Sequence, residues 1–83
     1  METNDIEKRY WSIQEVAENL DLPKSKVRFW EMAFGLAIKR NIKGFRYFVQ
    51  SDVETLSLIK NLLVERKFTI AGAKQELKLK GRL

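Results

Sequence analysis

Most of the charged side chains of this 83-residue sequence are cationic, and the sequence contains neither His nor Cys. Without those residues, disulfides, thiol redox chemistry, the usual zinc sites and the usual general base near neutral pH are excluded. The Asp, Glu, Lys and Tyr residues form no pattern typical of a catalytic site. We therefore expect no enzyme, no cofactor and no bound metal.

Positive charge is concentrated in the middle of the sequence. The net charge of the whole chain is +5, whereas residues 23–49 alone carry +6, because seven cations are opposed by the single acid Glu31. The seven are Lys24, Lys26, Arg28, Lys39, Arg40, Lys43 and Arg46. Such a local positive field favours a polyanionic partner, although ordinary solvated charge is the alternative for each residue taken singly.

Two short helices are expected to position the first of these cations. Ser12 and Glu15 form a capping box, and the apolar residues that follow repeat at the spacing of one buried helical stripe, which predicts a helix over about 13–19. A second helix is expected to begin near Pro23 and to end at Gly35, which suits a left-handed C-cap. Two helices joined by so short a turn form a helix-turn-helix, whose second helix enters the major groove in DNA-binding proteins.

The remaining cations fall in a predicted β-hairpin. The β-prone runs 38–40 and 45–49 flank residues 41–44, where Asn and Gly favour a tight reversal. Alternation along the second run places Arg46 on one face and Tyr47 on the other.

Two further helices are predicted after the hairpin. A capping box at Ser51 opens a helix of about fifteen residues with Arg66 and Lys67 in its last turn. Its apolar side chains fall on two nearly opposite sides, Val53, Leu56, Ile59 and Leu63 against Leu58 and Leu62. Thr69 can cap a last helix, whose apolar stripe of Ile70, Ala73 and Leu77 could cover the second side.

The expected fold is mainly α, a winged helix-turn-helix of four helices with a two-stranded β-hairpin wing. We expect a flexible N-terminus over 1–9, the DNA-binding domain over 10–78, and a tail or the start of a dimerisation helix over 79–83, where no convincing stop signal follows Lys78. No apolar run is long enough to span a membrane, and the charged start of the chain is not a secretory signal, so a cytoplasmic, nucleoid-associated location is expected.

The residues expected to contact DNA come from both basic elements. Arg28 suits bidentate bonds with phosphate or guanine, and Phe29 is equally explained by packing or by an apolar contact with sugar or a thymine methyl group. For Arg46 the alternative is an internal pair with Glu31. Trp11, Trp30 and Phe34 are interpreted as core residues. The full set of expected DNA-binding residues is Ser12, Lys24, Ser25, Arg28, Phe29, Arg40, Lys43, Arg46 and Tyr47.

Five segments resemble, in order, the DNA-binding domain of MerR-family transcription regulators. They are Tyr10 to Ala17, Val27 to Glu31, Gly44 to Phe48, Asp52 to Glu54 and Phe68 to Ala73. The resemblance covers Tyr10 to about Leu77. It implies a four-helix winged domain that dimerises through an antiparallel coiled coil after the last helix, binds a pseudo-palindromic promoter and distorts it. It also implies DNA contacts by Arg28 with its aromatic neighbour and by Arg46. Phe29 and Phe48 stand where the family often has Tyr, which removes a hydroxyl group at each position.

The sequence thus predicts sequence-specific binding of double-stranded DNA in transcriptional control, by a homodimer in the intact protein. One alternative is an excisionase-like architectural protein that bends DNA. An alternative of a different class is a protein-interaction module, in which Phe29, Tyr47 and Leu58 form an apolar docking patch.

Overall fold

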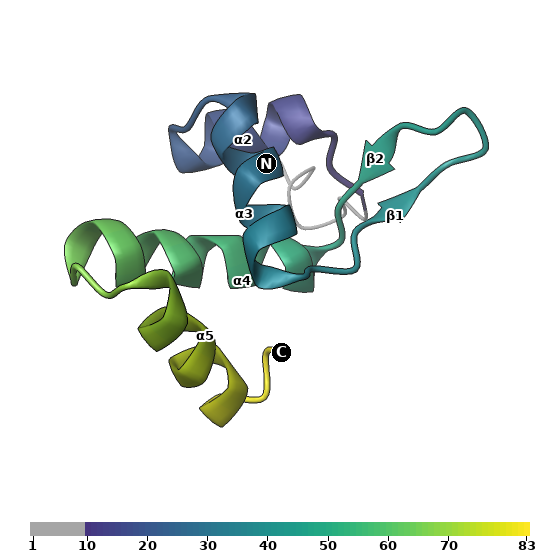
Figure 1. Cartoon of the computed structure of the whole chain (residues 1–83). Coiled ribbons are helices and arrows are strands. Elements are labelled where there is room, and N and C mark those ends of the chain that lie inside the picture. Colours follow the sequence, from purple (N-terminus) through teal and green to yellow (C-terminus); the bar gives the residue numbers. More distant parts are fainter. Residues whose placement is uncertain (1–9) are drawn as a thin grey trace, which may run out of the picture.

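The computed structural model describes residues 10–83, so the segment 1–9, expected to be flexible, lies outside the described residues. Within residues 10–83 the chain forms four helices and one antiparallel hairpin, as predicted (Figure 1). The elements are α2 (Ile13–Leu20), α3 (Lys24–Phe34), β1 (Lys39–Arg40), β2 (Arg46–Tyr47), α4 (Gln50–Lys60) with its π-helical continuation η1 (Asn61–Glu65), and α5 (Ile70–Leu79). None of the helices in this part of the chain is long and apolar enough to cross a membrane.

The helix-turn-helix forms where its caps predict it. Ser12 Oγ accepts a hydrogen bond from the Glu15 amide at 3.1 Å, and Glu15 Oε1 accepts one from the Ser12 amide at 2.9 Å, so the capping box at the start of α2 is confirmed. Asp21, in the left-handed conformation, ends α2. The helix α3 begins at Lys24 with Pro23 as its N-cap, so the predicted start near Pro23 is confirmed to within one residue. Gly35 ends α3 with φ of 64°, as expected.

The hairpin is shorter than the sequence predicts. Its strands hold two residues each, in the register Lys39 opposite Tyr47 and Arg40 opposite Arg46. The expected second strand continued to residue 49, but Phe48 instead pairs with Trp11, each amide donating to the other's carbonyl oxygen at 2.8 Å. The Phe48 side chain is completely buried at the base of the wing.

The start and end of α4 differ from the prediction. The helix begins at Gln50, because Asp52 Oδ2 accepts a hydrogen bond from the Val49 amide at 2.9 Å and thereby caps the helix two residues earlier than the predicted Ser51 box. At the other end, the helix closes in the π-helical turn η1, and Arg66 and Lys67 follow it instead of occupying its last turn.

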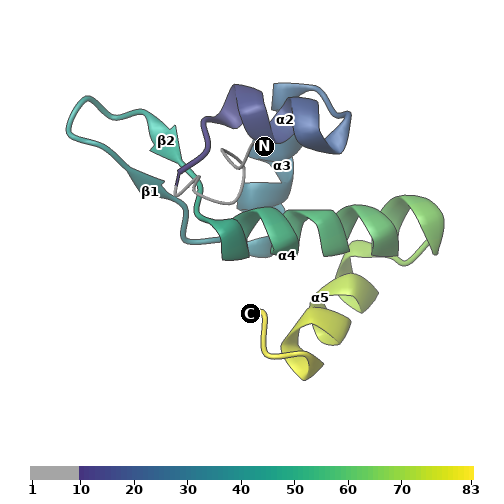
Figure 2. The same ribbon diagram turned by 180° about the vertical axis from the view of Figure 1, so that it is seen from behind.

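The core lies between α2, α3, the hairpin base and α4, and α5 extends it on the far side (Figures 1 and 2). Trp30 and Phe34 are buried as predicted, whereas Trp11 is half-buried. Leu62, which was placed on the face opposite the core, is completely buried, and Leu63 is only half-buried. The predicted cover by the last helix is confirmed, because α5 contacts η1 and buries Leu62 on the second apolar side; α5 also contacts α3.

Thr69 caps α5 as predicted, with its Oγ1 accepting a hydrogen bond from the Gly72 amide at 3.0 Å. The end of α5 was not predicted. Gly81 adopts φ of 74°, and the next amide, of Arg82, donates to the Leu77 carbonyl oxygen at 2.8 Å. This pairing is a Schellman motif, the usual glycine-dependent end of a helix. The expectation of no stop signal after Lys78 was therefore wrong, because the signal is Gly81.

One long-range hydrogen bond connects α4 to the helix-turn-helix. Lys60 Nζ donates a hydrogen bond to the Leu20 carbonyl oxygen at 2.6 Å. Carbonyl groups at the end of a helix have no partner within that helix and carry partial negative charge, so a cation there stabilises it. Lys60 thus attaches α4 to the C-terminus of α2 across 40 residues of sequence.

Candidate nucleic-acid interface

The polar side of α3 is presented to solvent. Its buried side chains are Val27, Trp30 and Phe34, which face the core. Its other side carries the predicted residues Lys24, Ser25, Arg28 and Phe29, all of them exposed. The helix therefore presents a basic side to any partner, as its periodicity indicated.

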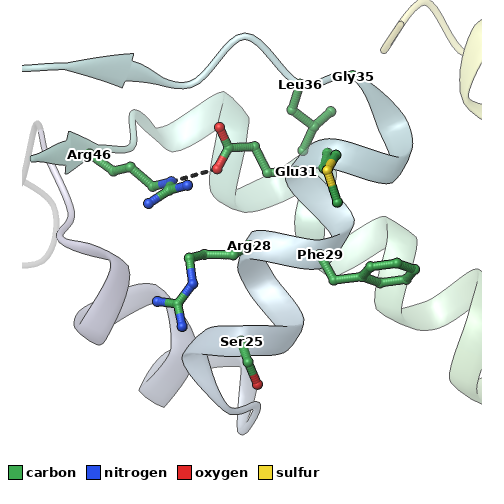
Figure 3. A pocket seen from close by; sticks show the side chains of 8 residues that line it. Ser25, Arg28, Phe29, Glu31, Gly35, Leu36 and Arg46 are labelled. Carbon is green, nitrogen blue, oxygen red and sulfur yellow. Dashed lines mark hydrogen bonds and ion pairs between the residues drawn. The ribbon is translucent and has the colours of Figure 1, made fainter. Parts of the chain in front are cut away.

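A groove of about 680 Å³ separates this side of α3 from the hairpin. It is lined by Ser25, Arg28, Phe29, Glu31, Met32, Gly35, Leu36 and Arg46. Figure 3 shows Arg28 extending from α3 on the side where Arg46 reaches in from β2, whereas the ring of Phe29 points the opposite way. The groove thus brings together the two arginines that were predicted separately from the helix and from the hairpin.

Arg46 is paired inside the domain. Its Nε lies 2.5 Å from Glu31 Oε1, and the two side chains keep only 21% and 16% of their exposed area, respectively. This is the internal pair that stood as the alternative to a DNA contact. An ion pair that connects β2 to α3 fixes the position of the hairpin beside the helix, so Glu31 organises the groove that it lines.

Two predicted residues have structural partners of their own. The ring of Tyr47 meets that of Tyr10 edge to face, with 5.2 Å between ring centroids, so the base of the hairpin packs on the segment before α2. Ser12 is exposed and caps α2. A DNA contact by either residue remains a prediction.

The hairpin cations Lys39, Arg40 and Lys43 are exposed. Arg40 Nη1 donates to the Gly44 carbonyl oxygen at 3.1 Å, which ties one of these cations to the turn. No acidic residue occurs between Leu36 and Val49 in the sequence, so nothing within the hairpin offsets its charge.

Sequence reasoning missed two exposed apolar residues on these elements. Met32, 75% exposed, lines the groove one helical turn after Arg28, a spacing that could have identified it. Ile42, at the tip of the hairpin, has a relative exposure of 101%. The sequence signal for Ile42 is an aliphatic residue in a turn whose other residues are Asn, Lys and Gly.

The apolar docking patch finds little support. Of its three residues only Phe29 is exposed, because Leu58 packs against the core and Tyr47 is half-buried against Tyr10. Two of the three side chains are thus used inside the domain.

The comparisons with known proteins agree with this geometry. Residues 11–80 match the model of the MerR HTH family regulatory proteins. Among solved structures, the chain is similar to HiNmlR, described as a MerR family regulator that lacks the sensor domain and is bound to promoter DNA. The TM-score is 0.74 at 21% sequence identity, and the match covers 86% of this chain. It covers 54% of that regulator, so this chain spans about half of its length. No curated protein sequence matches the chain.

Proposed function

This chain belongs to the MerR HTH family of regulatory proteins, and from that membership and the basic groove we infer that it binds specific sequences of double-stranded DNA to regulate transcription. Its family and fold are those of a DNA-binding regulator and not of an enzyme.

The proposed mode of binding places α3 in the major groove and the hairpin over the adjacent backbone. One observation carries this mode: the exposed guanidinium group of Arg28 lies on the same groove as the hairpin cation Arg46. A helix fits the major groove, where its side chains reach base edges, and cations on a neighbouring element bind phosphates and set the register.

The predicted residues divide into two roles. Arg28, near the middle of the exposed side of α3, is proposed to bind a guanine edge or a phosphate through both ends of its guanidinium group. Lys24 and Ser25, in the first turn, are proposed to bind the backbone, where the helix N-terminus also favours a phosphate. Arg40 and Lys43 are proposed to bind phosphates from the hairpin.

Arg46 is proposed to act at the same time as a phosphate ligand and as the partner of Glu31. Its Nε is engaged by the carboxylate, but a guanidinium group has further N–H donors. The shared fold with a regulator described as bound to promoter DNA supports the proposed DNA binding as a whole.

We further propose that the intact protein binds as a homodimer through segments that follow α5. A symmetric dimer recognises two half-sites related by a two-fold axis. Binding sites selected from random duplexes are then expected to be palindromic, with a fixed spacing between half-sites. Selection of single, unpaired half-sites would contradict the dimer while leaving DNA binding intact.

A salt titration of binding to duplex DNA tests the central proposal. If a dimer neutralises about eight phosphates, log K falls against log salt with a slope near −7. Arg28→Glu is expected to weaken binding by at least about tenfold, because it replaces a phosphate or base ligand by a repelling charge. Lys78→Glu, the same charge change at an exposed residue of α5, serves as the matched control. A slope near zero, or equal losses in the two variants, would refute the proposed interface.

A further inference from the structure

The end of the hairpin presents apolar side chains that the described part of the domain does not cover. Ile42 is fully exposed, and Phe45 retains 66% of its exposed area. Both views of the ribbon show the hairpin extending away from the helices (Figures 1 and 2). Ile42 therefore has no packing role toward residues 10–83.

The turn that carries Ile42 is held by several hydrogen bonds. Asn41 Oδ1 accepts from the amides of Lys43 and Phe45 at 2.9 and 3.0 Å. The Asn41 amide donates to the Phe45 carbonyl oxygen at 2.8 Å, and the Gly44 amide donates to the Asn41 carbonyl oxygen at 2.9 Å. Gly44, at φ of 87°, supplies the positive φ that closes the turn. Ile42 is thus projected from a preorganised turn, and its β-branched side chain adds little conformational freedom.

The charge around Ile42 selects the kind of partner. Lys39, Arg40, Lys43 and Arg46 belong to the hairpin, which has no acidic residue. An apolar contact with a second copy of this hairpin would place these cations against one another. A polyanion that offers an apolar recess between its charges complements the tip.

We propose that Ile42 inserts into the minor groove of duplex DNA as an apolar wedge, while Arg40 and Lys43 bind the phosphates on either side. This inference rests on the proposed function and adds a second, groove-specific contact to it. The minor groove is about 6 Å wide, too narrow for the whole hairpin but wide enough for one aliphatic side chain. Apolar side chains inserted there partly unstack base steps and kink the duplex.

A minor-groove wedge predicts a preference that depends on one chemical group. In the minor groove a G·C pair differs from an A·T pair by the amino group on guanine C2. That group stands on the groove floor, where the wedge would enter. Inosine lacks it, so an I·C polymer has the minor groove of A·T while its major groove keeps the acceptors and donor of G·C.

The experiment measures binding of the full chain to poly(dA-dT), poly(dG-dC) and poly(dI-dC) by fluorescence anisotropy. We expect the wild-type chain to bind the A·T and I·C polymers about tenfold more tightly than the G·C polymer. This factor corresponds to burial of part of an aliphatic side chain. Ile42→Ser should bind all three polymers with equal affinity, whereas Ile42→Val, which keeps an apolar β-branched group, should retain most of the preference.

Lys43→Gln provides the contrast between an apolar and a charged contact. It should weaken binding to all three polymers by the same factor and make the salt slope shallower by about one unit, because it removes a phosphate contact only. Ile42→Ser should leave the salt slope unchanged.

Three results would overturn the wedge. The first is equal wild-type affinity for the G·C and I·C polymers. The second is a retained preference in Ile42→Ser. The third is an Ile42-dependent affinity for anionic lipid vesicles without any preference among the polymers. If no polymer is bound although the duplex of the salt titration is, the wedge fails alone, as it does when the polymers are bound without an Ile42 effect. If no duplex is bound at all, the proposed DNA binding fails together with the wedge.

Discussion

Glu31 Oε1 and Arg46 Nε lie 2.5 Å apart, and this ion pair joins α3 to the hairpin across the groove proposed to bind DNA. The pair places the only acid of residues 23–49 against a hairpin cation. Glu31 therefore has two opposing effects: it holds the hairpin beside the helix, and it reduces the positive potential of the groove.

Glu31→Gln should separate those two effects. The amide keeps the size of the side chain and can still accept a hydrogen bond from Arg46, but the negative charge is gone. We expect affinity for duplex DNA at low salt to rise about fivefold and the salt slope to steepen by about one unit, because Arg46 then interacts more fully with phosphate. Stability should fall by about 1 kcal/mol, measured by urea unfolding, because a charge-assisted bond becomes a neutral one.

Glu54→Gln is the matched control for this charge change. Glu54 lies on α4 and pairs with Arg82 at 3.3 Å, in an exposed position on a helix other than α3. Its substitution should leave the salt slope nearly unchanged. Weaker DNA binding by Glu31→Gln than by the wild type would show that positioning of the hairpin outweighs the lost repulsion.

Lys60→Met should lower the free energy of unfolding by about 1–2 kcal/mol. Met keeps the apolar stem of the side chain but removes the bond to the Leu20 carbonyl oxygen and the favourable charge at the end of α2. Urea unfolding measures the change. Lys74→Met, at an exposed residue of α5, should change stability by less than about 0.5 kcal/mol. Equal effects of the two substitutions would contradict a special role for Lys60.

Gly35→Ala should destabilise the domain by about 1–2 kcal/mol although there is space for the added methyl group. No atom lies within 4 Å of an added Cβ, so the cost comes from the backbone, whose φ of +64° disfavours an L side chain. Thermal unfolding followed by circular dichroism measures it. A neutral result would indicate that the end of α3 rearranges without loss.

Lys67→Gly, in contrast to Gly35→Ala, should stabilise the domain. Lys67 is a non-glycine residue at φ of 60°, between η1 and α5. Glycine relieves this conformation but adds freedom to the unfolded chain, so a net stabilisation of about 0.5–1 kcal/mol is expected. Lys67→Ala, which removes the long side chain but keeps the Cβ, is the control and should give no such gain.

Local signals in the sequence were sufficient for most of the fold. The capping box at Ser12, the glycine at position 35 and the cap at Thr69 each fix a helix end through hydrogen bonds between near neighbours. The exposed side of α3 also follows from periodicity alone, because Val27 and Trp30 must face the core.

Features that depend on tertiary contacts could not be predicted in the same way. The Glu31–Arg46 pair stood as an alternative to a DNA contact, because charge composition does not say which partner is within reach. The contact of α5 with η1, which buries Leu62, was expected from the apolar stripe of the last helix, but its contact with α3 was not. The Lys60 bond to Leu20 links residues that no local pattern connects.

The double hydrogen bond between Trp11 and Phe48 bears on the spacing of the proposed DNA site. It connects the base of the hairpin to the segment that leads directly into α2, and the Glu31–Arg46 pair connects the hairpin to α3, so the hairpin is held on both helices of the helix-turn-helix. The distance between α3 and the hairpin is therefore fixed. If α3 and the hairpin bind DNA as proposed, a base pair inserted between their two contact regions should weaken binding.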